Sequence, residues 1–299
     1  MALSGVQYEL AAGDYVATIA EVGASLRRYT VGGVDVTVPF GEDVLPPKCD
    51  GAVLVPWPNR LRNGRYRFAG VPYQLALTEP AQGNAIHGLA RWVRWTALQV
   101  QSSSVRLGVD IVPQTGWVFE VHVEVTYTLR SDSGLSVTIE AVNTGSAPAP
   151  FGAGFHPYLS LHGHCLADTA VLIPAARRLL VDAVQIPVGT QSVQGTEHDL
   201  RVGRVLDRTR FDDGFTELRT AAGRGVAEVR TPSGGAQVWF DSAFGYLQVF
   251  TVEELMPGLA AVAVEPMTCA ADAFNSGDGL MVLQPGQPWT ATWGITPLP

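Results

Sequence analysis

An acidic side chain at the end of an apolar stretch is the first candidate for chemistry in this chain. Glu265 follows the small and apolar residues 261–264 and directly precedes Pro266. A carboxylate held against a hydrophobic core is costly unless it is paired or has a task. In isolation Glu265 could also be an exposed glutamate at a strand end, so its role depends on the other groups that the chain supplies.

A histidine in the run Phe155-His156-Pro157-Tyr158 is the second candidate. An unperturbed imidazole titrates near pH ~6.5, so His156 is suited to proton transfer near neutrality. Together, a carboxylate base and an imidazole acid can move protons to and from a substrate. We expect the apolar strand to raise the pKa of Glu265 above its usual ~4.3, and we expect nearby acids to hold His156 protonated.

Three further segments carry groups that could bind a polar substrate. Arg60 follows Asn59 in a Trp- and Pro-rich stretch, and its guanidinium is a fork-shaped donor that suits hydroxyl groups. His87 ends the run 84–87, and the glycine after it would let the backbone approach a ligand closely. The third segment is the acidic doublet Asp212-Asp213, which could equally be a solvated turn.

In order and spacing, these segments resemble the active-site motifs of the aldose 1-epimerases, the galactose mutarotase family. The resemblance runs from about Gly13 to Ile295. It implies that Glu265 is the general base at the anomeric hydroxyl and that His156 is the general acid. It also implies that the sugar is bound by three side chains: Arg60, His87 and Asp212. The choice between Asp212 and Asp213 stays open.

The reaction that the resemblance implies is the interconversion of the α and β anomers of a hexose. The hemiacetal opens, the C1–C2 bond rotates, and the ring closes on the other face of the carbonyl. Opening needs a base at the C1 hydroxyl and an acid at the ring oxygen, and each positioned proton transfer contributes about 10²–10⁴-fold. No metal, nucleotide or redox cofactor is required, and the partner is a small-molecule sugar.

Two other functions on the same scaffold remain open. The first is an epimerase for a phosphorylated or otherwise acidic hexose, which would need a cationic subsite. Three arginines could supply one: Arg62, Arg91 and Arg94. The chain has Leu89 where the family often has a second glycine, and no Asn follows Leu159, so the identity of the sugar stays open. The second alternative is a non-catalytic sugar-binding protein, which would not need an acid–base pair.

The elements that must position these groups are β-strands. Residues 121–129 and 135–141 alternate apolar and polar side chains around the turn 131–134, which predicts a hairpin, and 105–111 alternates before it. Further strand patterns cover 66–68 and 73–75 (around a turn at 69–72), 236–241 and 246–252. Sustained helical periodicity is absent, and 32 Gly and 20 Pro punctuate the chain. These patterns predict an all-β protein, a large antiparallel β-sandwich.

The resemblance makes this sandwich a supersandwich of the galactose mutarotase type, with the site in a shallow cleft on the concave face of a sheet. No internal repeat or linker divides the chain, so we expect one domain over residues 1–299. The stretch 186–205, which contains three glycines, is the best candidate for a long loop.

Composition narrows the partners and the compartment. The net charge of −8 argues against nucleic acid, and no window approaches the roughly 18 apolar residues of a membrane span. No signal peptide is visible, and three widely spaced cysteines suit free thiols in a reducing compartment, so we expect a cytoplasmic monomer or homodimer. The run 162–165 (His-Gly-His-Cys) lacks a second ligand pair, so we expect no metal site.

Overall fold

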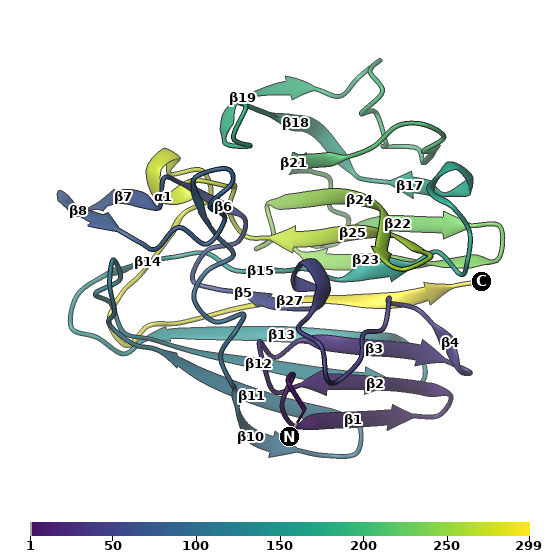
Figure 1. Cartoon of the computed structure of the whole chain (residues 1–299), viewed down its shortest axis with the longest axis horizontal. Helices are drawn as coiled ribbons and strands as arrows, with labels where there is room; N and C mark the ends of the chain where they lie inside the picture. Colours follow the sequence, from purple (N-terminus) through teal and green to yellow (C-terminus); the bar gives the residue numbers. More distant parts are fainter. Residues whose placement is uncertain (1) are drawn as a thin grey trace.

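The computed structural model describes residues 2–299, and two large antiparallel sheets dominate it (Figure 1). The first sheet has nine strands in the order β10 (Thr96–Val100), β11 (Ser104–Ile111), β12 (Val121–Arg130), β13 (Gly134–Asn143), β27 (Pro288–Leu298), β23 (Gly234–Asp241), β22 (Arg224–Thr231), β17 (Ala170–Leu172) and β20 (Arg204–Val205). The second has eight: β19 (Pro187–Ser192), β18 (Ala175–Val181), β21 (Asp212–Leu218), β24 (Tyr246–Met256), β25 (Leu259–Met267), β15 (Gly154–Phe155) and β5 (Val53–Leu54), with β16 (Tyr158–Ser160) also paired to β25.

Smaller sheets surround these two. One contains β1 (Gln7–Ala12), β2 (Tyr15–Ala20), β3 (Leu26–Val31) and β4 (Val34–Asp35). The strand pairs are β14 (Ala149–Phe151) with β26 (Met281–Leu283), β6 (Arg60–Arg62) with β9 (Asn84–Ile86), and β7 (Arg65–Phe68) with β8 (Val71–Gln74). In the described part of the chain, helical structure is limited to α1 (Ala273–Ser276) and the 3-10 turns η1 (Pro47–Cys49) and η2 (Leu166–Asp168). Within residues 2–299, no helix has the length and apolarity needed to cross a membrane.

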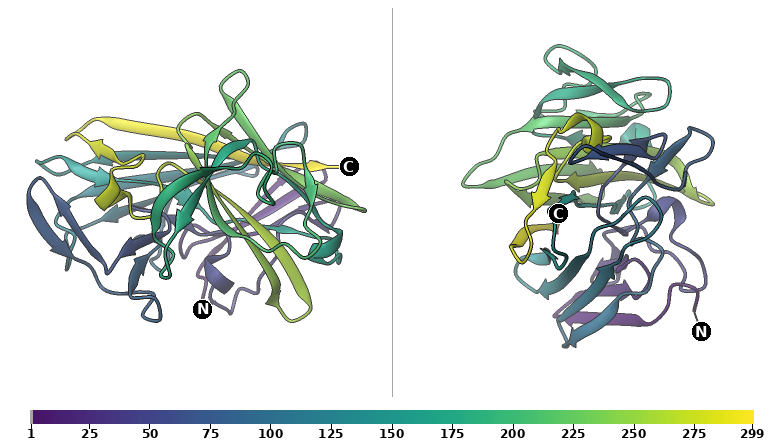
Figure 2. Two further views of the ribbon diagram at one scale, coloured as in Figure 1. Left: turned by 90° about the horizontal axis from the view of Figure 1, so that it is seen from above. Right: turned by 90° about the vertical axis from the view of Figure 1, so that its left-hand side faces the viewer.

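The core lies between the two large sheets. On β12, Val121, Val123 and Val125 are buried while the residues between them are partly exposed, as the alternating pattern predicted. From the opposite sheet, the Phe155 ring packs 4.9 Å from the Trp293 ring, measured between centroids. Burying a large apolar side chain of this kind contributes about 1.5–3 kcal/mol, so the sheets are held together by their inner faces. Figures 1 and 2 place the β7–β8 hairpin, with α1 beside it, at the end of the molecule opposite the C-terminus.

Most of the predicted strands are confirmed. The hairpin of β12 and β13, the preceding β11, and strands over 236–241 and 246–252 are all present. In the β7–β8 hairpin the turn is shorter than expected, because Ala69 and Gly70 both adopt left-handed backbone angles and let β8 start at Val71. Pro72 fits inside β8 because a two-stranded ribbon has a free edge that needs no N–H donor.

The prediction of a long loop over 186–205 is wrong in part. Residues 187–192 form β19, which pairs with β18 at the edge of the eight-stranded sheet. Most of β19 is exposed, so its sequence lacks the apolar alternation that marks a strand with one buried face. Backbone pairing with a neighbour, which composition does not reveal, makes this segment a strand.

Candidate active site

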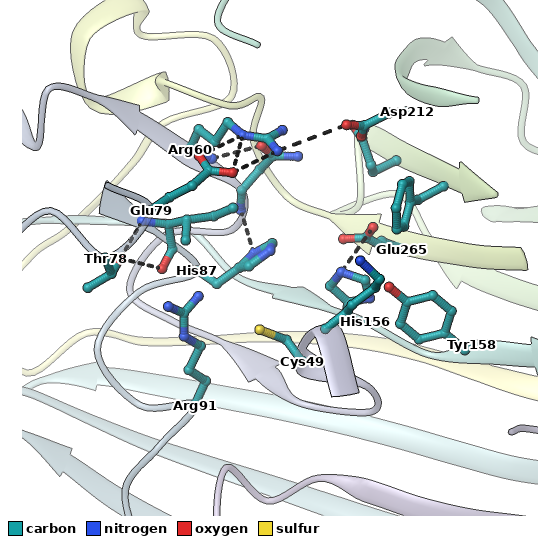
Figure 3. Close-up of a pocket in the computed structure, with 15 residues that line it drawn as sticks. Cys49, Arg60, Thr78, Glu79, His87, Arg91, His156, Tyr158, Asp212 and Glu265 are labelled. Atoms are coloured by element: carbon teal, nitrogen blue, oxygen red, sulfur yellow. Dashed lines mark hydrogen bonds and ion pairs between the residues drawn. The ribbon is translucent and has the colours of Figure 1, made fainter. Parts of the chain in front are cut away.

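Glu265 and His156 face each other across adjacent strands of the eight-stranded sheet (Figure 3). Both β15 and β16 pair with β25: Gly154 of β15 lies opposite Met267, and Tyr158 of β16 lies opposite Ala263. His156 lies between these two strands and therefore opposite Glu265. Pro157 has no N–H to donate to the ladder, so strand pairing is interrupted at this position. The Oε1 atom of Glu265 lies 3.4 Å from Nε2 of His156.

Both groups are removed from water, with 2% of Glu265 and 5% of His156 exposed. Burial raises the pKa of Glu265 well above its usual range; Asp212 adds to the rise and Arg60 opposes it. Burial lowers the pKa of His156 to about 3, and the cation of Arg91 contributes to the decrease. The expected rise for Glu265 is thus present, but the expectation that acids hold His156 protonated is wrong, because desolvation outweighs them. Both shifts favour the neutral forms, so a single proton shared by the pair prefers the carboxyl group of Glu265 to the ring of His156.

His87 lies beside His156, with the two ring centroids 5.3 Å apart. Its Nδ1 accepts a hydrogen bond of 3.1 Å from the backbone N–H of Asn59. Burial lowers the pKa of His87 well below its usual value, so the ring is neutral and Nε2 carries the proton. Gly88 has φ +69°, and a Cβ there would lie 2.0 Å from the carbonyl oxygen of Val55. Only glycine fits this position, and it fixes the backbone that presents His87.

Arg60 forms an array of charged groups with two acids. Its guanidinium donates to both carboxylate oxygens of Glu79, with Nε–Oε2 and Nη2–Oε1 distances of 3.0 Å. Nη2 also lies 3.9 Å from Oδ2 of Asp212, whose other oxygen accepts a 2.7 Å hydrogen bond from Nε2 of Gln248. Because each group restrains its neighbour, the array presents fixed donors and acceptors to the pocket.

The structure separates the two members of the acidic doublet. Successive residues of a strand point to opposite faces, and it is Asp212 that lines the pocket, where burial raises its pKa. Asp213 instead accepts a hydrogen bond of 3.3 Å from Nη1 of Arg178, and it lies 3.3 Å from Nε2 of His198. Asp213 is thereby committed to contacts outside the pocket.

The pocket has a volume of about 310 Å³ and brings together all five residues that the sequence singled out. The lining is completed by Arg91 and by residues that sequence reasoning missed or left without a role: Lys48, Cys49, Asn59, Thr78, Glu79, Ile86, Tyr158, Gln248 and Phe250. A signal existed for Gln248, which pairs with Glu265 across β24 and β25 and so shares its face of the sheet. No pattern marked Glu79, because it lies in an irregular segment before β9.

The three arginines considered for a cationic subsite have different positions. Arg62 donates a 2.6 Å hydrogen bond to Asp182, and Arg94 pairs with Glu21, and neither lines the pocket. Arg91 does line it and is only 6% exposed. Throughout residues 2–299, no group of three or more His, Cys, Asp or Glu side chains is placed to hold a metal ion.

Comparison with known proteins agrees with the fold. The uncharacterized protein YihR of Escherichia coli K12 is 35% identical over 288 residues, 96% of this chain and 92% of that protein. A solved structure of a putative aldose 1-epimerase from Escherichia coli K12 has a TM-score of 0.83 at 22% identity, covering 98% of both chains. A homologue of aldose epimerases from C. elegans has a TM-score of 0.85 at 19% identity, also over 98% of both. The family model of aldose 1-epimerase matches residues 6–296, and this chain therefore belongs to the aldose 1-epimerase family.

Proposed function

We propose that this protein is a mutarotase, which interconverts the α and β anomers of a hexose by opening and closing its ring. The observation that carries the proposal is the buried pair of Glu265 and His156, 3.4 Å apart in a sugar-sized pocket. A volume near 310 Å³ is at the lower end of small-molecule sites, which suits a monosaccharide.

Glu265 and His156 together can supply the base and the acid that the reaction needs. With Glu265 ionised and His156 protonated, the carboxylate takes the proton of the C1 hydroxyl while the bond between C1 and the ring oxygen breaks. The ring oxygen receives the proton of His156, which yields the open-chain aldehyde. After rotation about C1–C2, the reverse transfers close the ring on the other face. The pair begins and ends with one proton, so the cycle draws none from solvent.

The starting ionisation follows from an internal transfer. A proton shared by the pair prefers Glu265, and moving it to His156 leaves the net charge of the pair unchanged. Sugar hydroxyls that donate to the carboxylate would favour this charged form, because hydrogen bonds to an ion offset its desolvation. Substrate binding would thereby prepare the base.

The remaining pocket groups suit a polyhydroxylated ring. We assign hydroxyl binding to Arg60 and Asp212 and a donor role near the ring oxygen to Nε2–H of His87. Phe250, which lines the same pocket, offers an apolar surface for the C–H face of a sugar.

A direct test is magnetisation-exchange NMR of anomer interconversion with glucose and galactose. Wild-type protein should accelerate exchange of at least one of them far above the rate in buffer. Saturable binding without acceleration of any sugar would instead identify a binding protein. The buried acid–base pair argues against that alternative, since binding alone has no use for it.

A further inference from the structure

Arg91 is a buried cation without a counterion. Its Nε and Nη1 atoms are shielded from solvent and have no hydrogen-bond partner within residues 2–299, and no carboxylate there lies within 4.0 Å of its guanidinium. Figure 3 shows the guanidinium below Thr78 and His87, on the side of the site away from Glu265. An arginine remains charged at all ordinary pH values, and a desolvated charge left unpaired is costly. A bound anion would therefore offset the cost of burying Arg91.

The neighbours of Arg91 do not supply that anion. Cys49 is the adjacent polar side chain, and burial raises the pKa of its thiol, so the sulfur stays protonated and uncharged. Glu79, the nearest acid to influence Arg91, already receives two hydrogen bonds from Arg60. The pocket's other negative groups lie on the opposite side, around Glu265 (Figure 3).

A second cation, Lys48, also lines the pocket, and its ammonium lies 5.9 Å from the centroid of the Phe250 ring. Lys48 is the only lysine in the 299-residue chain, and it lines the pocket next to Cys49. Both residues adopt left-handed backbone angles, with φ +47° for Lys48 and +65° for Cys49. Non-glycine residues in this region cost about 1–3 kcal/mol each, and such strain concentrates at functional sites. The turn is thus held in a costly shape that presents Lys48 to the pocket.

We propose that the substrate is an aldose carrying an anionic group, a carboxylate, sulfonate or phosphate, which Arg91 and Lys48 bind. The inference deepens the proposed mutarotase function and rests on it. In a chain of net charge −8, two cations without a carboxylate partner among residues 2–299 line this one pocket and form a local field that would select an anion.

The geometry indicates where on the sugar this group is attached. The ring oxygen is bonded to C1 and C5, so with Glu265 at the C1 hydroxyl and His156 at the ring oxygen, C5 lies on the far side from Glu265. His87 and Arg91 lie on that side (Figure 3), and the charge of Arg91 lowers the pKa of both imidazoles. The anionic group therefore belongs on the exocyclic carbon attached to C5.

The test compares kcat/KM for anomer exchange of glucose with that of three analogues bearing a carboxylate, a sulfonate or a phosphate at C6. At least one anionic sugar should exceed glucose by about 10-fold or more, since each charged hydrogen bond is worth that factor or better. The fastest of the three analogues then identifies whether the anionic group is a carboxylate, a sulfonate or a phosphate. Glucose exchanging as fast as or faster than all three would overturn the inference while leaving the mutarotase function standing.

Single substitutions test which residues cause the preference for anionic over neutral sugars. Arg91→Gln should lower the ratio of anionic to neutral kcat/KM by about 10- to 100-fold, and the exposed Lys48→Gln should lower it by a few-fold. Arg94→Gln is the matched control, because it removes the same charge from the same loop outside the pocket and should leave the ratio unchanged. An equal change in the Arg91 and Arg94 variants would show that the effect is not local and would refute the subsite.

Binding measurements test the anionic subsite even if the protein interconverts the anomers of no sugar. Calorimetric titration of the C6 anions should give a Kd that weakens about 10-fold or more in Arg91→Gln, independently of catalysis. Lys48 is the only lysine, so acetylation of amines modifies only Lys48 and the N-terminus, and mass spectrometry distinguishes the two. A bound anionic sugar should slow its acetylation, and glucose at equal occupancy should do so less. If anomers exchange but neither the Kd in Arg91→Gln nor the acetylation of Lys48 changes, the anionic subsite is refuted. If both change but no sugar is exchanged, the mutarotase function is refuted.

Discussion

Replacing Glu265 with Gln should separate what this carboxyl group does for catalysis from what it does to stability. Gln keeps the size and much of the hydrogen bonding, but it cannot accept a proton from the C1 hydroxyl. We expect kcat for anomer exchange to fall by about 10²–10⁴-fold, the contribution of one positioned proton transfer. The Kd of the sugar should change only a few-fold, because the carboxylate acts mainly in the transition state.

The same change should stabilise the protein, and increasingly so as the pH rises. The folded pKa of Glu265 is raised well above 4.5, so the folded state binds the proton more tightly than the unfolded chain. The stability of the wild type relative to Glu265→Gln is therefore highest below pH 4.5 and declines as the pH rises from 4.5 to the folded pKa. Over that window the loss is about 1.4 kcal/mol for each pH unit.

Thermal unfolding of both proteins at a series of pH values from 5 upward measures this difference. A chain of this size shifts in Tm by about 2–4 °C per kcal/mol, so below the folded pKa of Glu265 the variant should gain about 3–6 °C over wild type for each pH unit. The contribution of His156 is common to both proteins and largely cancels in the comparison. A gap in Tm that does not widen with pH would refute the raised pKa. A variant that keeps half of the wild-type kcat would show that another group is the base.

Three other changes test neighbouring parts of the site. His156→Asn should reduce kcat by about 10²-fold or more with little effect on Kd, measured by exchange NMR and calorimetry, and an equal loss of both would assign His156 to binding alone. Asp212→Asn should raise KM by about 10-fold while Asp213→Asn leaves KM unchanged and lowers Tm; the reverse pattern would show that the wrong member of the doublet was assigned. Gly88→Ala should destabilise by about 3 kcal/mol or more in chemical denaturation, because its Cβ would lie 2.0 Å from a carbonyl oxygen, and a change under 1 kcal/mol would contradict this geometry.

The sequence by itself determined the all-β architecture and the acid–base pair proposed for the candidate site. Strict alternation over 121–129 can bury its apolar residues only as a strand, so β12 and its hairpin partner were predictable. Glu265 and His156 were identifiable because each lies within a short motif whose order along the chain resembles the family. Local patterns carry this kind of information because they depend on neighbours in sequence.

The tertiary structure decided which groups share the pocket and in which ionisation state. Glu79 and Arg91 lie in irregular segments, so only the folding of distant loops onto the sheet brings them into the pocket. The pKa of His156 fell although acids lie near it, because desolvation depends on the packing of the whole chain around the ring. Likewise, the sequence did not distinguish the three arginines. In the folded chain Arg62 and Arg94 pair with acids, whereas Arg91 has no carboxylate partner among residues 2–299. Burial and charge pairing depend on contacts between residues that are far apart along the chain, so they can be known only from the folded structure.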